Sequence, residues 1–245
     1  MPKFTTTGDT LKNLLKYMDI CNNHTKLDFE KDKMTFVSID PSSTCMLVGN
    51  INPAIAFDSY EAERDTIIID VKDFDTILKR IKKNKASFEV TDMKAIIVKE
   101  GNTTWNVRSI DDDSRFPRPD LSTDNSFTLS SEKFIEELTR AMDGGDVVDI
   151  EIKEDCVILC GMSEYSTPII TRIPAEELTN LCYVNDSRSQ FTKSFLEDLL
   201  KHVPSGVSIR VGVDNQYPLC ITITASDNSY SINYYLAPRI EEDDL

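Results

Sequence analysis

The sequence predicts an α+β protein made of two similar domains, each with two helices packed on antiparallel sheet. Three patterns in the 245 residues lead to this prediction. Apolar residues recur at helical spacing in four segments, alternating apolar and polar residues mark short strands between them, and this order of helices and strands occurs twice along the chain.

The helical pattern predicts four helices, at residues 9–20, 70–85, 131–143 and 191–203. Each places its apolar residues on one face, which is typical of a helix that covers a sheet. The first helix shows this spacing with Leu11, Leu14, Leu15 and Met18.

Capping and turn residues indicate where these helices begin and end. Asp70 and Ser130 are residue types that cap a helix, so they indicate the starts of the second and third helices. Pro204 indicates the end of the fourth. Residues 94–98 and 219–224 alternate as strands do, and short strands joined by turns predict antiparallel pairing.

The repeat has an offset of 123 residues early in each half and 121 residues later. Phe4–Asp9 matches Phe127–Glu132 in pattern, and Phe74 matches Phe195. Identical residues are few, so the agreement lies in the order of apolar and polar positions. We therefore expect both halves to have the same fold.

A polar segment with two prolines and no apolar period separates the halves. The expected organisation is an N-terminal domain at 1–110, an interdomain connecting loop at 111–125 and a C-terminal domain at 126–245. The loop begins with Asp111, Asp112 and Asp113, which raises the alternative of a metal site. No other ligand type lies nearby in sequence, so a solvated linker is preferred.

The chain is strongly acidic, with 42 Asp and Glu against 27 Lys and Arg and a net charge of −15. Its general surface should therefore repel nucleic acid and anionic lipid. No apolar run approaches the roughly 20 residues that span a bilayer, and residues 1–17 have no apolar signal core. We expect no membrane partner.

Nearly half of the Lys and Arg residues fall in the four predicted helices. Two interpretations remain open. Amphipathic helices expose charge to water in any case, and Lys is a good helix former. Alternatively, one helix-lined surface faces a polyanion and binds its phosphates without sequence preference.

No residue pattern predicts catalysis. His24 and His202 lie in polar stretches, and the nucleophile, phosphate-binding and zinc-protease motifs do not occur. The six cysteines contain no C-x-x-C pair, so we interpret them as buried structural thiols of a reducing compartment rather than metal ligands. We expect no metal, no cofactor and no enzymatic activity.

Three segments resemble the PCNA-type family of DNA sliding clamps. Val37–Val48, which contains Asp40-Pro41-Ser42, resembles a first-domain segment of that family. Ala56–Glu61 is also similar, and Leu236-Ala237-Pro238-Arg239 resembles the family's C-terminal signature. The resemblance covers the whole chain and points to the archaeal, eukaryotic and viral branch. It implies the DNA-clamp fold and a ring of three two-domain subunits, a homotrimer around duplex DNA.

The resemblance implies three groups of site residues. The DNA-facing candidates on the helices are Lys12, Lys16, Lys72, Lys79, Arg80, Lys82, Lys83, Arg140 and Lys201. The pocket for a partner's PIP-box peptide is expected at Thr44, Cys45, Leu47, Phe116, Leu121, Pro218, Tyr235, Leu236, Ala237 and Pro238. The subunit interface is expected at Trp105, Val107, Ile169 and Thr171. The acidic third helix departs from an evenly basic DNA-facing surface.

The family further implies a processivity factor that tethers DNA polymerase, flap endonuclease and ligase and is placed on DNA by a clamp loader. We therefore expect a cytoplasmic protein at the nucleoid of an archaeal cell, encoded by the cell or by a virus of that host, or a nuclear protein if the source is eukaryotic. One alternative is a subunit of a heteromeric or checkpoint-type clamp. Another is an acidic hydrolase or transferase on duplicated α+β domains, for which the sequence offers no nucleophile.

Overall fold

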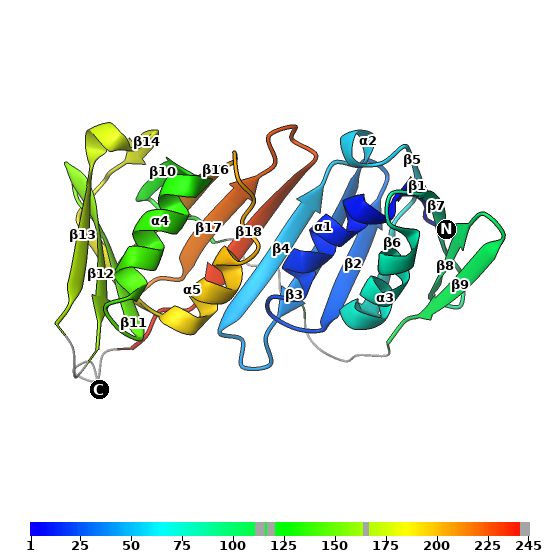
Figure 1. Ribbon diagram of the computed structural model, residues 1–245, viewed down its shortest axis with the longest axis horizontal. Helices are drawn as coiled ribbons and strands as arrows, with labels where there is room; N and C mark the ends of the chain where they lie inside the picture. The colour runs from blue at the N-terminus through cyan, green and yellow to red at the C-terminus, as the bar shows by residue number, and fades with distance from the viewer. Residues whose placement is uncertain (111–115, 117–120, 164–166, 241–245) are drawn as a thin grey trace. The chain divides into compact units, whose positions relative to one another are not determined.

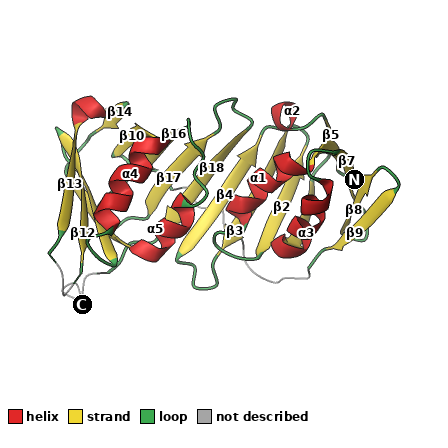
Figure 2. Ribbon diagram, in the orientation of Figure 1, coloured by secondary structure: helices red, strands yellow, loops and turns green. Residues whose placement is uncertain are grey.

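The computed structural model describes residues 1–110, 116, 121–163 and 167–240. The chain divides into two compact units (Figure 1). The first unit is formed by residues 1–118 with 227–232, and the second by residues 119–226 with 233–245. Strands dominate both units, and each has one pair of longer helices (Figure 2).

The first unit contains a five-stranded antiparallel sheet in the order β5-β1-β7-β8-β9 and a second run of paired strands in the order β4-β3-β2-β6. Its elements are β1 (Lys3–Thr7), α1 (Gly8–Met18), β2 (His24–Glu30), β3 (Lys33–Ile39), β4 (Cys45–Ile51), α2 (Pro53–Ala56), β5 (Ser59–Glu61), β6 (Asp65–Asp70), α3 (Val71–Ile81), β7 (Lys85–Val90), β8 (Ala95–Glu100) and β9 (Thr103–Arg108).

The second unit repeats this order of elements. Its strands pair as β14-β10-β16-β17 and as β13-β12-β11-β15. The elements are β10 (Ser126–Ser130), α4 (Ser131–Met142), β11 (Val147–Ile152), β12 (Cys156–Met162), β13 (Ile169–Pro174), the 3-10 turn η1 (Ala175–Glu177), β14 (Asn180–Cys182), β15 (Ser187–Thr192), α5 (Lys193–Leu200), β16 (Ser208–Gly212), β17 (Leu219–Thr224) and β18 (Tyr230–Leu236).

The duplication extends to the helix caps. The Thr7 hydroxyl accepts from the Thr10 amide at the start of α1, and the Ser130 hydroxyl accepts from the Lys133 amide at the start of α4. These two caps lie 123 residues apart, at the predicted offset. The α+β fold, the duplicated order and the cap at Ser130 are therefore confirmed.

The core of the first unit is a cluster of aromatic rings. The ring of Phe4 on β1 stacks against Phe88 on β7 at 4.8 Å and against Phe57 at 4.9 Å. Phe88 meets the edge of Phe74 on α3, and Phe4 also lies 6.3 Å from Phe29 on β2. The cluster thus joins both sets of strands to the helix layer, which buries the apolar face of α3.

Helix α3 begins as predicted but ends four residues early. The Asp70 carboxylate accepts from the amides of Lys72 and Asp73 at 2.8 and 3.1 Å, which confirms its cap. The helix ends at Ile81 rather than residue 85, because Lys82 adopts a φ of 53°. Its amide still bonds to the Leu78 carbonyl, which satisfies the last turn.

Three other expectations need correction. The fourth helix is shorter than predicted, at Lys193–Leu200, since Phe191 and Thr192 belong to β15. The sequence patterns do not predict the short elements α2 and η1, because four and three residues are too few to show a helical period. Only Cys45 and Cys156 of the six cysteines are buried. Cys21, Cys160 and Cys220 are half-buried, and Cys182 is exposed because it ends the three-residue edge strand β14.

Candidate nucleic-acid and partner interfaces

Helix α3 and the residue pair after it carry the densest set of cations in the first unit. Lys72, Arg80, Lys82 and Lys83 are all exposed. Within the described residues, no carboxylate pairs with any of these four side chains. They present uncompensated positive charge on a chain that is acidic as a whole.

The fold holds these cations beside α1, which lies next to α3 (Figure 1). The Lys82 carbonyl accepts from the Asp9 amide at 2.8 Å, so the end of α3 is bound to the start of α1. On α1, Lys12 is half-buried and Lys16 is exposed, and the Lys16 ammonium donates to the Asn13 side chain at 3.4 Å.

The remaining DNA-facing candidates are compensated by carboxylates of their own segments. Lys79 pairs with Asp75 at 2.5 Å, and Lys201 pairs with Asp198 at 2.7 Å. Arg140 is held between Glu136 and Glu137, at 2.7 and 2.8 Å. Within the described residues, the structure thus separates the nine predicted cations into six that form no ion pair, namely the four near α3 with Lys12 and Lys16 on α1, and three that are neutralised locally, two of them in the second unit.

The Asp40-Pro41-Ser42 motif forms the turn between β3 and β4. The Asp40 carboxylate accepts from the Ser42 amide at 3.1 Å and from the Cys45 amide at 2.6 Å. This turn places Thr44 half-exposed at the start of β4, whereas Cys45 and Leu47 are 2% and 0% exposed. Their side chains therefore pack in the protein's own core.

The other predicted pocket residues lie in the predicted connecting loop and beside the ends of β17 and β18. Phe116, in the first unit, is half-buried. In the second unit Leu236 is buried, and the half-buried residues are Leu121, Pro218, Tyr235, Ala237 and Pro238. The amide of the next residue, Arg239, donates to the Gln190 carbonyl of β15 at 2.8 Å and anchors this end of the chain.

The predicted interface residues lie on the outermost strands of two sheets. Trp105 and Val107 belong to β9, the last strand of the five-stranded sheet. Ile169 and Thr171 belong to β13, the first strand of the sheet β13-β12-β11-β15. Trp105 and Ile169 are half-buried, and Ile170 beside them is 65% exposed. Edge strands of this kind leave backbone groups available to another strand.

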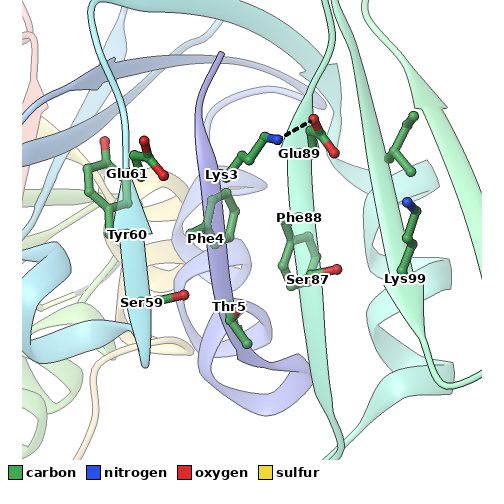
Figure 3. A pocket seen from close by; sticks show the side chains of 11 residues that line it. Lys3, Phe4, Thr5, Ser59, Tyr60, Glu61, Ser87, Phe88, Glu89 and Lys99 are labelled. Atoms are coloured by element: carbon green, nitrogen blue, oxygen red, sulfur yellow. Dashed lines mark ion pairs between the residues drawn. The ribbon is translucent and has the colours of Figure 1, made fainter.

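A shallow groove crosses the five-stranded sheet of the first unit (Figure 3). Its volume is about 420 Å³, and hydroxyl side chains of Thr5, Ser59 and Ser87 lie along it. Lys3 pairs with Glu89 at 2.9 Å, which raises the pKa of the lysine and lowers that of the glutamate. The groove has balanced charge and no catalytic arrangement, and no sequence motif indicates it.

A buried amide that no sequence motif indicates fixes the start of β10. Asn125 is 0% exposed, and both N–H groups of its side chain donate, to Asp214 at 2.7 Å and to Asn185 at 3.0 Å. Its side-chain oxygen accepts from the amides of Val184 and Asn185 at 2.8 and 3.3 Å. The group's full hydrogen-bonding capacity is used. Asn125 thereby connects the loop before β15 with the loop after β16.

Within the described residues, no group of three or more His, Cys, Asp or Glu side chains is placed to hold a metal ion. In the same part of the chain, no helix has the length and hydropathy needed to cross a membrane.

Burial raises the pKa of Cys220 to about 11, so this thiol is mostly protonated at neutral pH.

Comparison with known proteins gives relatives of matching length. Two are described as DNA polymerase sliding clamps. The chain is 21% identical over 248 residues to the one from Methanocella arvoryzae, which covers 99% of this chain and 100% of the relative. It is 23% identical over 252 residues to the one from Natronomonas pharaonis, with the same coverage. No family model matches the chain.

Solved structures agree on the fold. The structure of the C-terminal region of FEN-1 bound to A. fulgidus PCNA matches with a TM-score of 0.88 and 22% identity, covering 99% of this chain and 100% of that one. A chain of the PCNA2–PCNA3 complex from Sulfolobus tokodaii matches with a TM-score of 0.81 and 18% identity, covering 98% and 100%. The predicted PCNA-type fold and resemblance are confirmed over the full length.

The Asn125 network predicts a large effect from one substitution. Asn125→Ala should lower the free energy of unfolding by about 3 kcal/mol, because it leaves buried partners without hydrogen bonds. Urea denaturation measures the decrease, and amide exchange at Val184 should accelerate. Asn180→Ala, at an exposed position of the same unit, is the control and should change stability by less than about 0.5 kcal/mol. An unchanged urea midpoint for Asn125→Ala would contradict this assignment.

Proposed function

We propose that the chain is a DNA polymerase sliding clamp, a processivity factor that encircles duplex DNA and holds replication and repair enzymes on it without catalysis of its own. The observation that carries this proposal is the end-to-end similarity to archaeal sliding clamps together with the PCNA fold. The cations near α3 add an independent physical reason for contact with a polyanion.

The proposed assembly is a ring of three identical subunits. A head-to-tail interface has to close on itself, because otherwise it grows into a filament. The edge strands β9 and β13 are the proposed partners, since each ends its sheet and each carries half-buried apolar side chains. Pairing them across subunits would cover backbone groups that are otherwise available for aggregation.

A heteromeric clamp is the second candidate. The similarity to a chain of the PCNA2–PCNA3 complex is the observation that favours it. In that case ring formation would require a second, related chain. For either assembly, the archaeal relatives favour action on the DNA of an archaeal cell or of a virus in an archaeal host.

The partner enzymes are proposed to be DNA polymerase, flap endonuclease and ligase, with a clamp loader to open the ring. The structure of an archaeal clamp with the C-terminal region of FEN-1 supports a peptide as the form of contact. We propose peptide contact in the second unit for the half-buried residues Leu121, Pro218, Tyr235, Ala237 and Pro238, and in the first unit for Thr44 and Phe116. Cys45 and Leu47 of the first unit and Leu236 of the second are buried, so each would support the surface of its own unit from beneath.

Light scattering over a range of concentrations tests the assembly directly, because it measures the mass of the particle in solution. The wild-type chain should have three times the monomer mass and should raise polymerase processivity on primed circular DNA with a cognate loader and polymerase. Trp105→Ala should shift the mass toward the monomer by weakening the β9 edge, and Ile55→Ala, at an exposed site away from β9, should not. A folded wild-type monomer at every concentration, with no stimulation of the polymerase, would refute the homotrimer.

The DNA interaction predicts different roles for two sets of three cations. The triple variant Arg80→Gln/Lys82→Gln/Lys83→Gln should reduce the salt dependence of duplex binding by about 0.9 in log–log slope for each phosphate that these cations neutralise. The matched variant Lys79→Gln/Arg140→Gln/Lys201→Gln removes the same charge, but its cations are already paired. It should reduce the slope by less than half as much. Equal slopes for the two variants, measured by anisotropy of a labelled duplex, would contradict this division.

The peptide interaction predicts that Tyr235 contributes to affinity. Tyr235→Ala should weaken binding of a labelled peptide from the C-terminal region of FEN-1 by about tenfold, because aromatic anchors dominate such interfaces. Tyr183→Ala is the matched control, since it removes an exposed tyrosine of the same unit. Titration calorimetry gives both affinities. If Tyr235→Ala retains the wild-type affinity while its thermal unfolding is unchanged, the assignment of this residue is wrong.

A further inference from the structure

A small cavity in the second unit is lined almost entirely by hydrogen-bond donors. It has a volume of about 290 Å³ and lies where β15, the β16–β17 turn and the segment after β18 meet. Its lining residues are Arg188, Ser189, Gln190, Asn215, Gln216 and Arg239. The described residues that line it include two arginines and no Asp or Glu, in a chain whose net charge is −15.

The first of the two arginines is held rigidly by acidic neighbours. The Nε and Nη2 atoms of Arg188 both donate to one oxygen of Asp149, each at 2.6 Å, and Glu151 lies 3.6 Å from Nε. Asp149 is 2% exposed, so this ion pair is anchored in the interior of the unit. The Arg188 backbone is fixed as well, because its amide donates to the Asn215 side chain at 2.8 Å.

The second arginine is positioned but not neutralised. The Arg239 amide donates to the Gln190 carbonyl at 2.8 Å, and its Nη1 lies 3.4 Å from the Thr192 hydroxyl. Among the described residues, no carboxylate forms an ion pair with Arg239. Its guanidinium is exposed and keeps most of its five N–H donors for another group.

This combination is suited to a carboxylate. A guanidinium offers parallel N–H donors that match the two oxygens of a carboxylate, and side-chain amides add donors at the rim. Because Arg188 is already paired with Asp149 and Glu151, the charge available to an acidic partner in this cavity is that of Arg239.

We propose that the cavity between Arg188 and Arg239 binds an acidic side chain of a partner peptide, adjacent to the main peptide-contact residues. The inference rests on the proposed function, because Arg239 directly follows Tyr235–Pro238, which are assigned there to peptide contact. It adds a specificity that the proposed function does not contain. Partners with an aspartate or glutamate flanking the bound segment are selected over those without one.

The test uses labelled peptides from the C-terminal region of FEN-1, extended at either end by Asp-Asp or by the isosteric Asn-Asn. For extension at one of the two ends, the wild-type chain should bind the Asp-Asp peptide about fivefold more tightly at low salt. Raising the salt concentration should reduce this preference, since the ion pair is partly exposed.

Arg239→Gln should abolish the preference for Asp-Asp while leaving the affinity for Asn-Asn unchanged. Arg210→Gln is the matched control, because Arg210 is also exposed in the second unit but does not line the cavity. It should keep the preference. Arg188 is not suited to this test, since its removal would strand the buried Asp149 carboxylate and alter stability.

Two failures are distinguishable. If the wild-type chain binds the Asp-Asp and Asn-Asn peptides equally at both ends, or if Arg239→Gln keeps the preference, this inference is overturned and the peptide-binding function stands. If the wild-type chain binds none of the four peptides, the proposed peptide interaction itself fails, and the inference fails with it.

Discussion

The limited face that a helix can bury determines how the rest of this structure is arranged. The apolar face of α3 is taken up by the core, where Phe74 meets Phe88 and Phe88 stacks on Phe4. The second unit likewise buries Phe127 on β10, the counterpart of β1, and Phe134 on α4, the counterpart of α1. With one face of each helix committed to the sheets, charged side chains can lie only on the opposite face. The positions available for contact with DNA therefore follow from how the core is packed.

Core packing determines which helix positions can carry an exposed cation, and local ion pairs determine which of these cations can contact a phosphate. Arg140 has carboxylates three and four positions before it on α4, and both bond to its guanidinium. Arg80 on α3 has Thr76 and Ile77 at the same positions and forms no ion pair within the described residues. A surface charge that is already paired gains less from a phosphate, because the first pair has to be given up. The acidic residues of the third predicted helix, α4, thus leave its Arg140 less available to a phosphate than Arg80 on α3.

The parts of the fold that could be predicted from sequence depend on nearby residues. The apolar spacing of Leu11, Leu14 and Leu15, the cap at Asp70 and the repeat offset are all patterns within a few residues or between two similar segments. Asn125 could not be recognised, because its partners Asn185 and Asp214 lie 60 and 89 residues away. The same holds for Arg188 and Asp149, which are 39 residues apart and meet only when β11 and β15 pair.

Because the two units have the same fold, a comparison of corresponding positions shows which residues the fold requires and which occur in one unit only. On β11 and β15, Glu151 pairs in register with Arg188, and the corresponding pair on β2 and β6 is Asp28 with Thr66. The first unit satisfies its carboxylate with the Thr66 hydroxyl, at 2.6 Å, and with Lys26 at 3.4 Å. Both units form the same strand pairing, so the fold does not require a guanidinium at this position. Arg188 is therefore an addition of the second unit, because Thr66 holds the corresponding position on β6 of the first unit.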